Sequence, residues 1–313
     1  MSGLSGLDRV VYGVEDMATS RKFFADWGLT LIRDEEDIIV FETLEKAQVV
    51  LRPMNAADLP APIEDGPTIR EVIWGADSQE DLDRFLAGID GKVETFIGHD
   101  GMVRTIDPNG MTIGFQLTLR RDADVKGVPS NPYGMPLRVD LPAPVYERAI
   151  PTRLAHVVFF VSDLEAHREF YIEKLGFNIT DEYPGRGFFS RCVKEGTHHN
   201  LFLLETPDKK KGVNHLSFGL RDIYEVMGGG IHFAKCGWDT QLGPGRHPIS
   251  SAFFWYFFCP GGGLVEYYAD EDYLTEKWQA RKMAPSPEKY AEWAVADGID
   301  PVTRRQKLRK VKV

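Results

Sequence analysis

Apolar and polar positions follow two different periods along the chain, and the same order of periods occurs twice. Residues 7–28 begin with the β-branched run of a strand and continue with a helical pattern whose apolar face includes Phe23. Residues 154–176 repeat this order, with Phe170 at the corresponding position. A glycine closes each segment, where a helix C-cap is expected. Each segment therefore predicts a strand followed by a helix.

The repetition extends over both halves of the chain. Identical residues recur at one offset of 147 positions: Asp16 and Asp163, Arg21 and Arg168, Phe23 and Phe170. The strand-then-helix pattern of residues 68–86 parallels 212–227, and the turn-then-strand pattern of 107–117 parallels 259–270. Each half is thus predicted to hold two strand–helix–strands modules, four in all, which gives an α+β fold of four βαβββ modules that arose by duplication.

Domain boundaries follow from the repeat and from composition. We expect a first module pair over residues 1–120 and a second over residues 151–275. The Pro-rich, charged residues 121–150 are expected to be a linker, and residues 276–313 a helical tail. Length alone would also have allowed one large domain.

Duplication provides an internal control for locating chemistry. Three residues of the second half correspond to residues of a different kind in the first. His156 corresponds to Arg9, His215 to Glu71, and Glu266 to Gly114. Seven of the eight histidines lie after residue 155. A role in the scaffold would not require these histidines in one copy alone, so the second half is predicted to carry a site that the first lacks.

Strand alternation supports a shared site for the three residues. Leu216 and Phe218 would form one apolar face of their strand, and His215 and Ser217 the opposite, more polar face. His156 lies in an apolar strand, and so does Glu266, whose burial would cost several kcal/mol unless the carboxylate is paired or binds a metal.

Two imidazoles and one carboxylate form the ligand set of non-haem Fe(II) oxygenases, which leaves positions open for substrate and O2. The sequence therefore predicts a mononuclear metal site of His156, His215 and Glu266. The alternative for each histidine taken singly is a hydrogen-bonded core or surface residue.

Three further residues could transfer or donate protons. The pair His198 and His199 begins a strand, and one of the two is expected to end in solvent. His247 precedes Tyr256 by nine residues, and Tyr256 precedes Glu266 by ten, so that the last two are expected on neighbouring strands of a hairpin. The alternative for Tyr256, which lies among aromatic residues, is a packing role.

Composition limits the partners. A formal charge of −10 argues against nucleic acid as the main partner, and no apolar run is long enough for a membrane helix. Three cysteines without CxxC spacing (Cys192, Cys236 and Cys259) fit reduced thiols, and we expect a cytoplasmic protein. The basic run 304–313 could anchor an acidic partner, or could simply be solvated. We further expect a homo-oligomer.

Taken together, these features resemble the type I extradiol ring-cleavage dioxygenases of the vicinal oxygen chelate (glyoxalase/bleomycin resistance/dioxygenase) superfamily, such as the 2,3-dihydroxybiphenyl 1,2-dioxygenases. The resemblance covers roughly residues 5–275, and its most specific segment is 243–270, with a His, a Tyr, a Pro-x-Gly turn and a Glu in order. It implies two domains, each a curved mixed sheet, and it implies cleavage of a small aromatic diol by O2 at Fe(II), with Mn(II) as the other possible ion.

The resemblance also assigns roles to residues. It implies that His156, His215 and Glu266 bind the iron, that His199 is the acid–base residue, and that His247 and Tyr256 form hydrogen bonds to substrate and oxygen. Ile249 and Ser250 depart from the Asn-Asp pair of many members, which bears on the substrate. Two rivals remain: a metal-dependent isomerase or thiol transferase of the same superfamily, and a non-catalytic protein that binds aromatic compounds or drugs.

Overall fold

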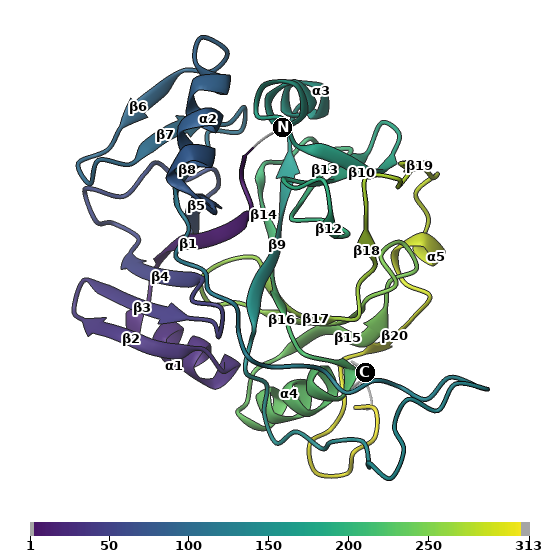
Figure 1. The fold of residues 1–313 in the computed structure, drawn as a ribbon. Helices are drawn as coiled ribbons and strands as arrows, with labels where there is room; N and C mark the ends of the chain where they lie inside the picture. The colour runs from purple at the N-terminus through teal and green to yellow at the C-terminus, as the bar shows by residue number, and fades with distance from the viewer. Residues whose placement is uncertain (1–2, 308–313) are drawn as a thin grey trace.

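The computed structural model describes residues 3–307 and contains the expected four modules (Figure 1). The first half holds β1 (Gly6–Val14), α1 (Met17–Trp27), β2 (Thr30–Glu35), β3 (Ile38–Glu42), β4 (Gln48–Pro53), β5 (Thr68–Ala76), α2 (Gln79–Ile89), β6 (Thr95–Ile97), β7 (Val103–Ile106) and β8 (Thr112–Leu117). The second half holds β9 (Arg153–Val161), α3 (Leu164–Arg168), the π-helix η1 (Glu169–Lys174), β10 (Asn178–Tyr183), β11 (Gly187–Arg191), β12 (Gly196–Thr197), β13 (Leu201–Glu205), β14 (Gly212–Gly219), α4 (Ile223–Lys235), β15 (Thr240–Arg246), β16 (Phe253–Phe258) and β17 (Leu264–Ala269).

Each half folds around one curved mixed sheet, and the two sheets lie side by side (Figure 1). The first sheet has the order β2-β3-β4-β1-β5-β8-β7-β6. The second contains the same series, β10-β11-β13-β9-β14-β17-β16-β15, with a short strand of the tail added at each edge. The α+β fold of βαβββ modules predicted from the sequence is confirmed.

The duplicated aspartates explain why both first helices begin where they do. The side chain of Asp16 accepts a hydrogen bond from the backbone N–H of Thr19 at 3.0 Å, and Asp163 accepts one from Ala166 at 3.0 Å. Both are N-caps, which satisfy an otherwise unpaired N–H of the first turn. Gly28 ends α1 with a φ of 104°, a conformation that favours glycine.

Aromatic packing joins the two halves behind the second sheet. Trp27 of α1 is fully buried and stacks on Tyr267 of β17, with ring centroids 3.6 Å apart. The Tyr267 hydroxyl donates to the carbonyl of Trp27 at 2.8 Å. Since Tyr267 follows Glu266 directly, the first half supports the strand that carries the predicted carboxylate ligand.

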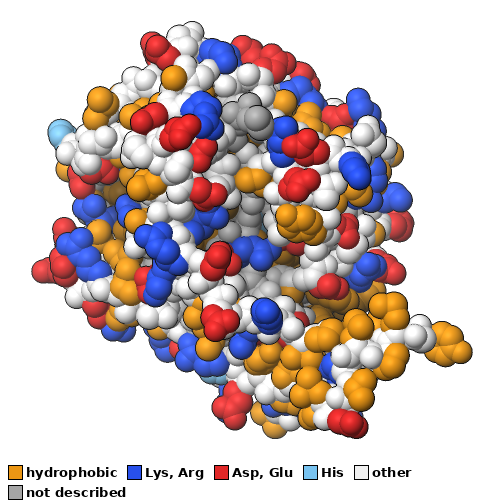
Figure 2. Space-filling model, in the orientation of Figure 1, with side chains coloured by type: hydrophobic (Ala, Val, Ile, Leu, Met, Phe, Trp, Pro, Cys, Tyr) orange, Lys and Arg blue, Asp and Glu red, His pale blue; other side chains and the backbone are white. Residues whose placement is uncertain are grey.

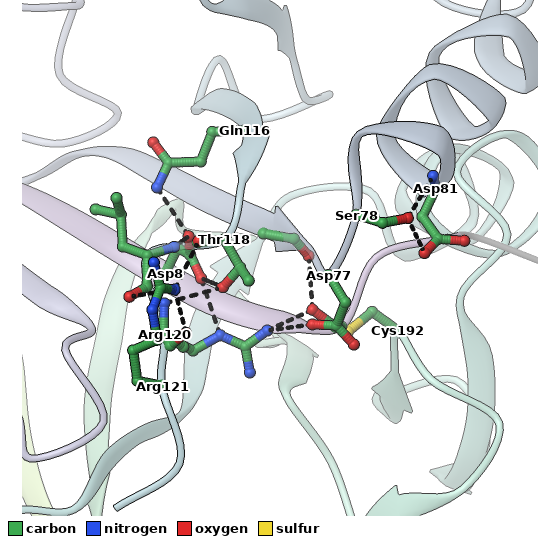
Figure 3. Close-up of polar contacts among 12 residues, drawn as sticks. Asp8, Asp77, Ser78, Asp81, Gln116, Thr118, Arg120, Arg121 and Cys192 are labelled. Carbon is green, nitrogen blue, oxygen red and sulfur yellow. Dashed lines mark hydrogen bonds and ion pairs between the residues drawn. The ribbon is translucent and has the colours of Figure 1, made fainter.

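A buried carboxylate fixes the end of the first half (Figure 3). Asp8 of β1 accepts hydrogen bonds from Gln116, Thr118, the backbone of Leu119 and Arg120, all between 2.7 and 2.9 Å. Four donors satisfy the oxygens of a fully buried Asp8, which is why this charge can remain in the interior. The cluster holds the chain at the point where residues 121–150 begin.

Residues 121–150 contain no helix or strand and extend along the outside of the second half (Figure 1). Within this segment, six large apolar side chains are more than half exposed, and Figure 2 shows hydrophobic side chains gathered where the segment projects. They are Tyr133, Met135, Leu137, Val139, Leu141 and Val145. No other part of residues 3–307 covers these side chains.

The prediction of a helical tail over 276–313 is wrong for the described residues. The tail contains β19 (Arg281–Lys282), one four-residue helix α5 (Pro287–Tyr290) and β20 (Trp293–Ala296), preceded by β18 (Tyr273–Leu274). β19 pairs with β10 and β20 with β15, so the tail closes both edges of the second sheet. Pairing with open edges outweighed a helical propensity that prolines interrupt. Of the basic run 304–313, residues 308–313 lie outside the described part of the chain.

Among residues 3–307, no helix combines the length and the apolar character that crossing a bilayer requires.

Candidate metal centre and active site

Strand register brings the three predicted ligands together. β9, β14 and β17 are neighbours in the second sheet, and Ser217 at the centre pairs with His156 on one side and with Glu266 on the other. His215 lies two residues before Ser217 on the same strand, and therefore on the same face. The three side chains thus surround the space above one small residue.

The separations of the ligand atoms fit one divalent ion. The Nε2 atoms of His156 and His215 are 3.1 Å apart, and an oxygen of Glu266 lies 3.0 Å from the first and 3.5 Å from the second. Metal–ligand bonds of about 2.1 Å at right angles would place neighbouring donor atoms about 3 Å apart. No other group of three or more such side chains with ligand atoms this close occurs among residues 3–307.

The protonation of His215 and Glu266 also suits a cation. All three candidate ligands are buried, and neither oxygen of Glu266 accepts a well-formed hydrogen bond within the described chain. Burial alone would raise the pKa of Glu266, but His156, His247 and His215 hold it well below its ordinary value. Burial lowers the pKa of His215 to about 3, against the opposing effect of Glu266. An ionised carboxylate beside a neutral imidazole is the state that binds a metal.

In the first half, the strand positions that correspond to this site hold an ion pair. Arg9 pairs with Ile73, which pairs with Gly114, and Glu71 lies two residues before Ile73. Arg9 therefore corresponds to His156 and Ile73 to Ser217. Gly114 corresponds to Glu266, and Glu71 to His215. Arg104 lies opposite Gly114, as Tyr256 lies opposite Glu266.

The buried Glu71 accepts a hydrogen bond from Arg104 Nε at 2.5 Å. A Cβ added at Gly114 would lie 2.8 Å from the sulfur of Met102 and 3.3 Å from a Glu71 oxygen, so a larger side chain there would require Met102 to move. The expected difference between the halves is thus present in the structure.

His247 and Tyr256 adjoin the ligands. The Nδ1 of His247 is 2.6 Å from the carbonyl oxygen of Tyr290, and its Nε2 is 3.0 Å from the Tyr256 hydroxyl. The carbonyl can only accept, so Nδ1 carries the proton in the neutral ring and Nε2 accepts from Tyr256. Burial, and then the charge of Glu266, raises the pKa of Tyr256 well above its ordinary value, which keeps the phenol protonated.

The histidine pair differs from the sequence expectation, because neither member ends in solvent. His198 and His199 are both buried, with Nδ1 atoms 3.1 Å apart, and His198 Nε2 lies 2.9 Å from an oxygen of Asp181. His199 stacks on His156 with ring centroids 4.0 Å apart. Burial, followed by the charges of neighbouring histidines, holds the pKa of His199 well below its ordinary value, so this ring is neutral.

Asp181 and Arg281 are residues of this environment that sequence reasoning missed. Burial raises the pKa of Asp181, but hydrogen bonds from His198 and Arg281 outweigh it, and the net pKa is lowered. Since the carboxylate accepts from His198 Nε2, the chain of hydrogen bonds puts the proton of His199 on Nδ1 and leaves its Nε2 as an acceptor. The two residues are 100 positions apart and meet only through the pairing of β10 with β19.

One cavity of about 320 Å³ contains these groups, a volume at the small end of ligand pockets. His156, His215, His199, His247 and Tyr256 all line it. Much of the remaining wall is apolar: Val158, Phe189, Phe202, Leu204, Ile249 and Leu264. The tail contributes Pro285, Ser286 and Tyr290. A flat apolar molecule carrying a few polar atoms would match this lining.

Comparisons with known proteins agree with the fold. Residues 153–267 match the Glyoxalase/Bleomycin resistance protein/Dioxygenase superfamily. Metapyrocatechase 2 of Cupriavidus necator is 28% identical over 201 residues, which cover 62% of this chain and 61% of that protein. The match thus spans less than two thirds of that relative.

Solved structures resemble the chain over nearly its whole length. A Mn(II)-bound glyoxalase from Novosphingobium aromaticivorans has a TM-score of 0.75 at 22% identity, covering 100% of this chain and 98% of that one. The 2,3-dioxygenase LapB from Pseudomonas sp. KL28 has a TM-score of 0.70 at 16% identity, covering 90% and 98%. The match of residues 153–267 to the Glyoxalase/Bleomycin resistance protein/Dioxygenase superfamily thus agrees with the superfamily that the sequence was found to resemble.

Proposed function

We propose that the protein cleaves a catechol-type aromatic diol beside its two hydroxyls with O2, at a mononuclear Fe(II) site held by His156, His215 and Glu266. The observation that carries the proposal is the convergence of this ligand set with His199, His247 and Tyr256 in one largely apolar cavity. The similarity to a metapyrocatechase supports it.

The ion, when bound, would hold the diol and O2 at adjacent positions and mediate electron transfer between them. Three protein ligands leave room for both reactants. A ligand set of this kind accepts Mn(II) as well as Fe(II). The choice of iron is therefore a more specific proposal than the presence of a divalent metal.

His199 is placed to remove a proton from the diol. Its Nε2 is the acceptor, because the bonds from Asp181 through His198 fix its tautomer, and its neutral state suits a base at neutral pH. The same nitrogen could return the proton later in the reaction. Asp181 and His198 would act through His199 and are positioning residues.

Tyr256 and His247 would stabilise negative charge that develops on oxygen. The Tyr256 hydroxyl remains protonated and can turn from His247 towards a substrate oxygen. Donors fixed in a cavity that excludes water stabilise charge more strongly than water does. The walls formed by Phe189, Phe202 and Ile249 would orient the ring.

The test is aerobic turnover after anaerobic loading with Fe(II). We expect O2 uptake together with a yellow ring-opened product from catechols, and loss of both in His215→Ala. O2 uptake that persists in this variant, or no turnover of any catechol by the iron-loaded protein, would refute the proposal.

A second candidate is a metal-dependent isomerase, because the Mn(II)-bound glyoxalase aligns over the full length of the chain. Isomerisation of a hemithioacetal without O2 uptake would favour it. Tight binding of aromatic compounds by metal-free protein, without turnover, would favour the non-catalytic alternative.

We also propose that the protein is a cytoplasmic homo-oligomer. The exposed apolar side chains of residues 133–145 support an oligomer, because a second copy could cover them. Light scattering should then give a mass above that of one 35.3 kDa chain. A monomer at micromolar concentration would contradict this.

A further inference from the structure

Arg186 differs from every other residue that lines the active-site cavity. Among residues 3–307 it is the one lysine or arginine in this lining, and no aspartate or glutamate of this range lines the cavity with it. The other polar groups of the wall are histidines, tyrosines, serines and amides. A positive charge that the cavity wall does not compensate is a recognition element for an anion.

The backbone of Arg186 is held on both sides. The residue lies in the turn between β10 and β11, where its N–H donates to the carbonyl of Tyr183 at 2.8 Å. Its own carbonyl accepts from the N–H of Glu205 at 2.7 Å. The side chain therefore starts from a fixed point of the sheet, and its half-buried position limits the directions it can take.

The guanidinium has no hydrogen bond or ion pair with any residue between 3 and 307, and neighbouring acids are already engaged. Asp181 binds His198 and Arg281. Glu182 binds Arg168 at 2.7 Å and Lys282 at 2.8 Å. Arginines elsewhere in this half, such as Arg153 and Arg221, are paired. Arg186 is thus a cation at the cavity for which residues 3–307 supply no partner.

Register separates Arg186 from the metal ligands. Gly187, the next residue, pairs with Leu204, which pairs with Phe160 of β9. Phe160 is four residues from His156, a displacement of roughly 13 Å at about 3.3 Å per residue. An anion bound at Arg186 would therefore lie apart from a diol bound near His156.

We propose that Arg186 binds a carboxylate of the substrate, and that the substrate is consequently an aromatic diol whose carboxylate is separated from the ring by a spacer. This inference rests on the proposed function for the diol, while the anion subsite stands on the cavity and on Arg186. Guanidinium and carboxylate form paired, charge-assisted hydrogen bonds, which makes arginine suited to this recognition.

A binding experiment tests the subsite without any turnover. The probes are 3-(4-hydroxyphenyl)propionate and its methyl ester, titrated calorimetrically into metal-free protein and into Mn(II)-loaded protein under argon. We expect the acid to bind about 10- to 100-fold more tightly than the ester, as for a hydrogen bond to a charged group. Arg186→Gln should abolish this preference, and Arg186→Lys should retain part of it. Lys235→Gln, an exposed lysine of α4, is the charge-matched control and should leave the preference unchanged.

Equal affinity for acid and ester in the unaltered protein would overturn the proposal, and so would an Arg186→Gln variant that loses affinity for both alike. Turnover supplies a second readout: 3-(3,4-dihydroxyphenyl)propionate should have a lower KM than its ester, and Arg186→Gln should raise that KM with little change in kcat. Cleavage of plain catechol without preference for the acid would refute the subsite and leave the proposed function standing. Preference for the acid without cleavage of any catechol would support the subsite and refute the proposed function.

Discussion

Ser217 allows a test of the metal centre that alters no ligand. It lies between His156 and Glu266 in the register of the sheet and is fully buried, and its hydroxyl has no hydrogen-bond partner in the described chain. The small side chain leaves the space that the ion would take. Ser217→Val adds branched bulk to this space and should therefore exclude the metal, although all three ligands remain.

The matched control is Ser217→Ala, which keeps the space open. Losing a buried hydroxyl without a partner should leave the metal-free protein equally stable, or more stable by about 1 kcal/mol. Valine should cost about 1–3 kcal/mol, as overpacking does in other cores. These values would come from urea unfolding of metal-free protein.

Metal content would be measured by mass spectrometry after anaerobic Fe(II) loading and desalting. We expect about one iron per chain in the unaltered protein and in Ser217→Ala, and almost none in Ser217→Val. A valine variant that is folded and retains iron would refute the placement of the ion above Ser217.

Three further predictions concern the surrounding residues. Arg104→Met leaves the buried Glu71 carboxylate without its partner and should lower the free energy of unfolding in urea by about 3–5 kcal/mol. Iron binding should be retained, and adding Glu71→Met should restore the stability. An unchanged unfolding curve would contradict the ion pair. Tyr256→Phe should lower kcat about 10²- to 10³-fold at unchanged iron content, as the loss of one oxyanion donor does, whereas full activity would assign Tyr256 to packing. Asp181→Asn should lower the free energy of unfolding by about 1–3 kcal/mol at pH 7, because the partly exposed Arg281 loses a charged hydrogen-bond partner. Since the folded pKa of Asp181 is below the unfolded value, this difference should persist down to about pH 4 and shrink as the pH falls further through the folded pKa; a difference that grows in acid would refute the assignment.

The sequence could predict that the three candidate ligands converge because duplication and alternation are local signals. His156, His215 and Glu266 each lie in a clear strand pattern, and comparison with Arg9 and Gly114 marked them as unlike their counterparts. The hairpin that sets Tyr256 opposite Glu266 followed from the spacing around a Pro-Gly turn. These inferences required only the period of two residues in a strand.

The remaining parts depend on contacts between distant segments. The tail was expected to be helical, yet β19 and β20 complete the edges of the second sheet, a pairing that no local pattern indicates. The burial of His198 follows from Asp181, which Arg281 of the tail holds in place. Arg186 gave no signal in the sequence, because its proposed role depends on its place in the folded cavity and on having no partner within the described chain.

The most direct test of the central claim is anomalous diffraction at the iron edge, from crystals grown anaerobically with Fe(II). We expect one peak per chain, within about 2.0–2.3 Å of His156 Nε2, His215 Nε2 and a Glu266 oxygen. A peak at other residues, or no peak in iron-soaked crystals with these three side chains in place, would contradict it.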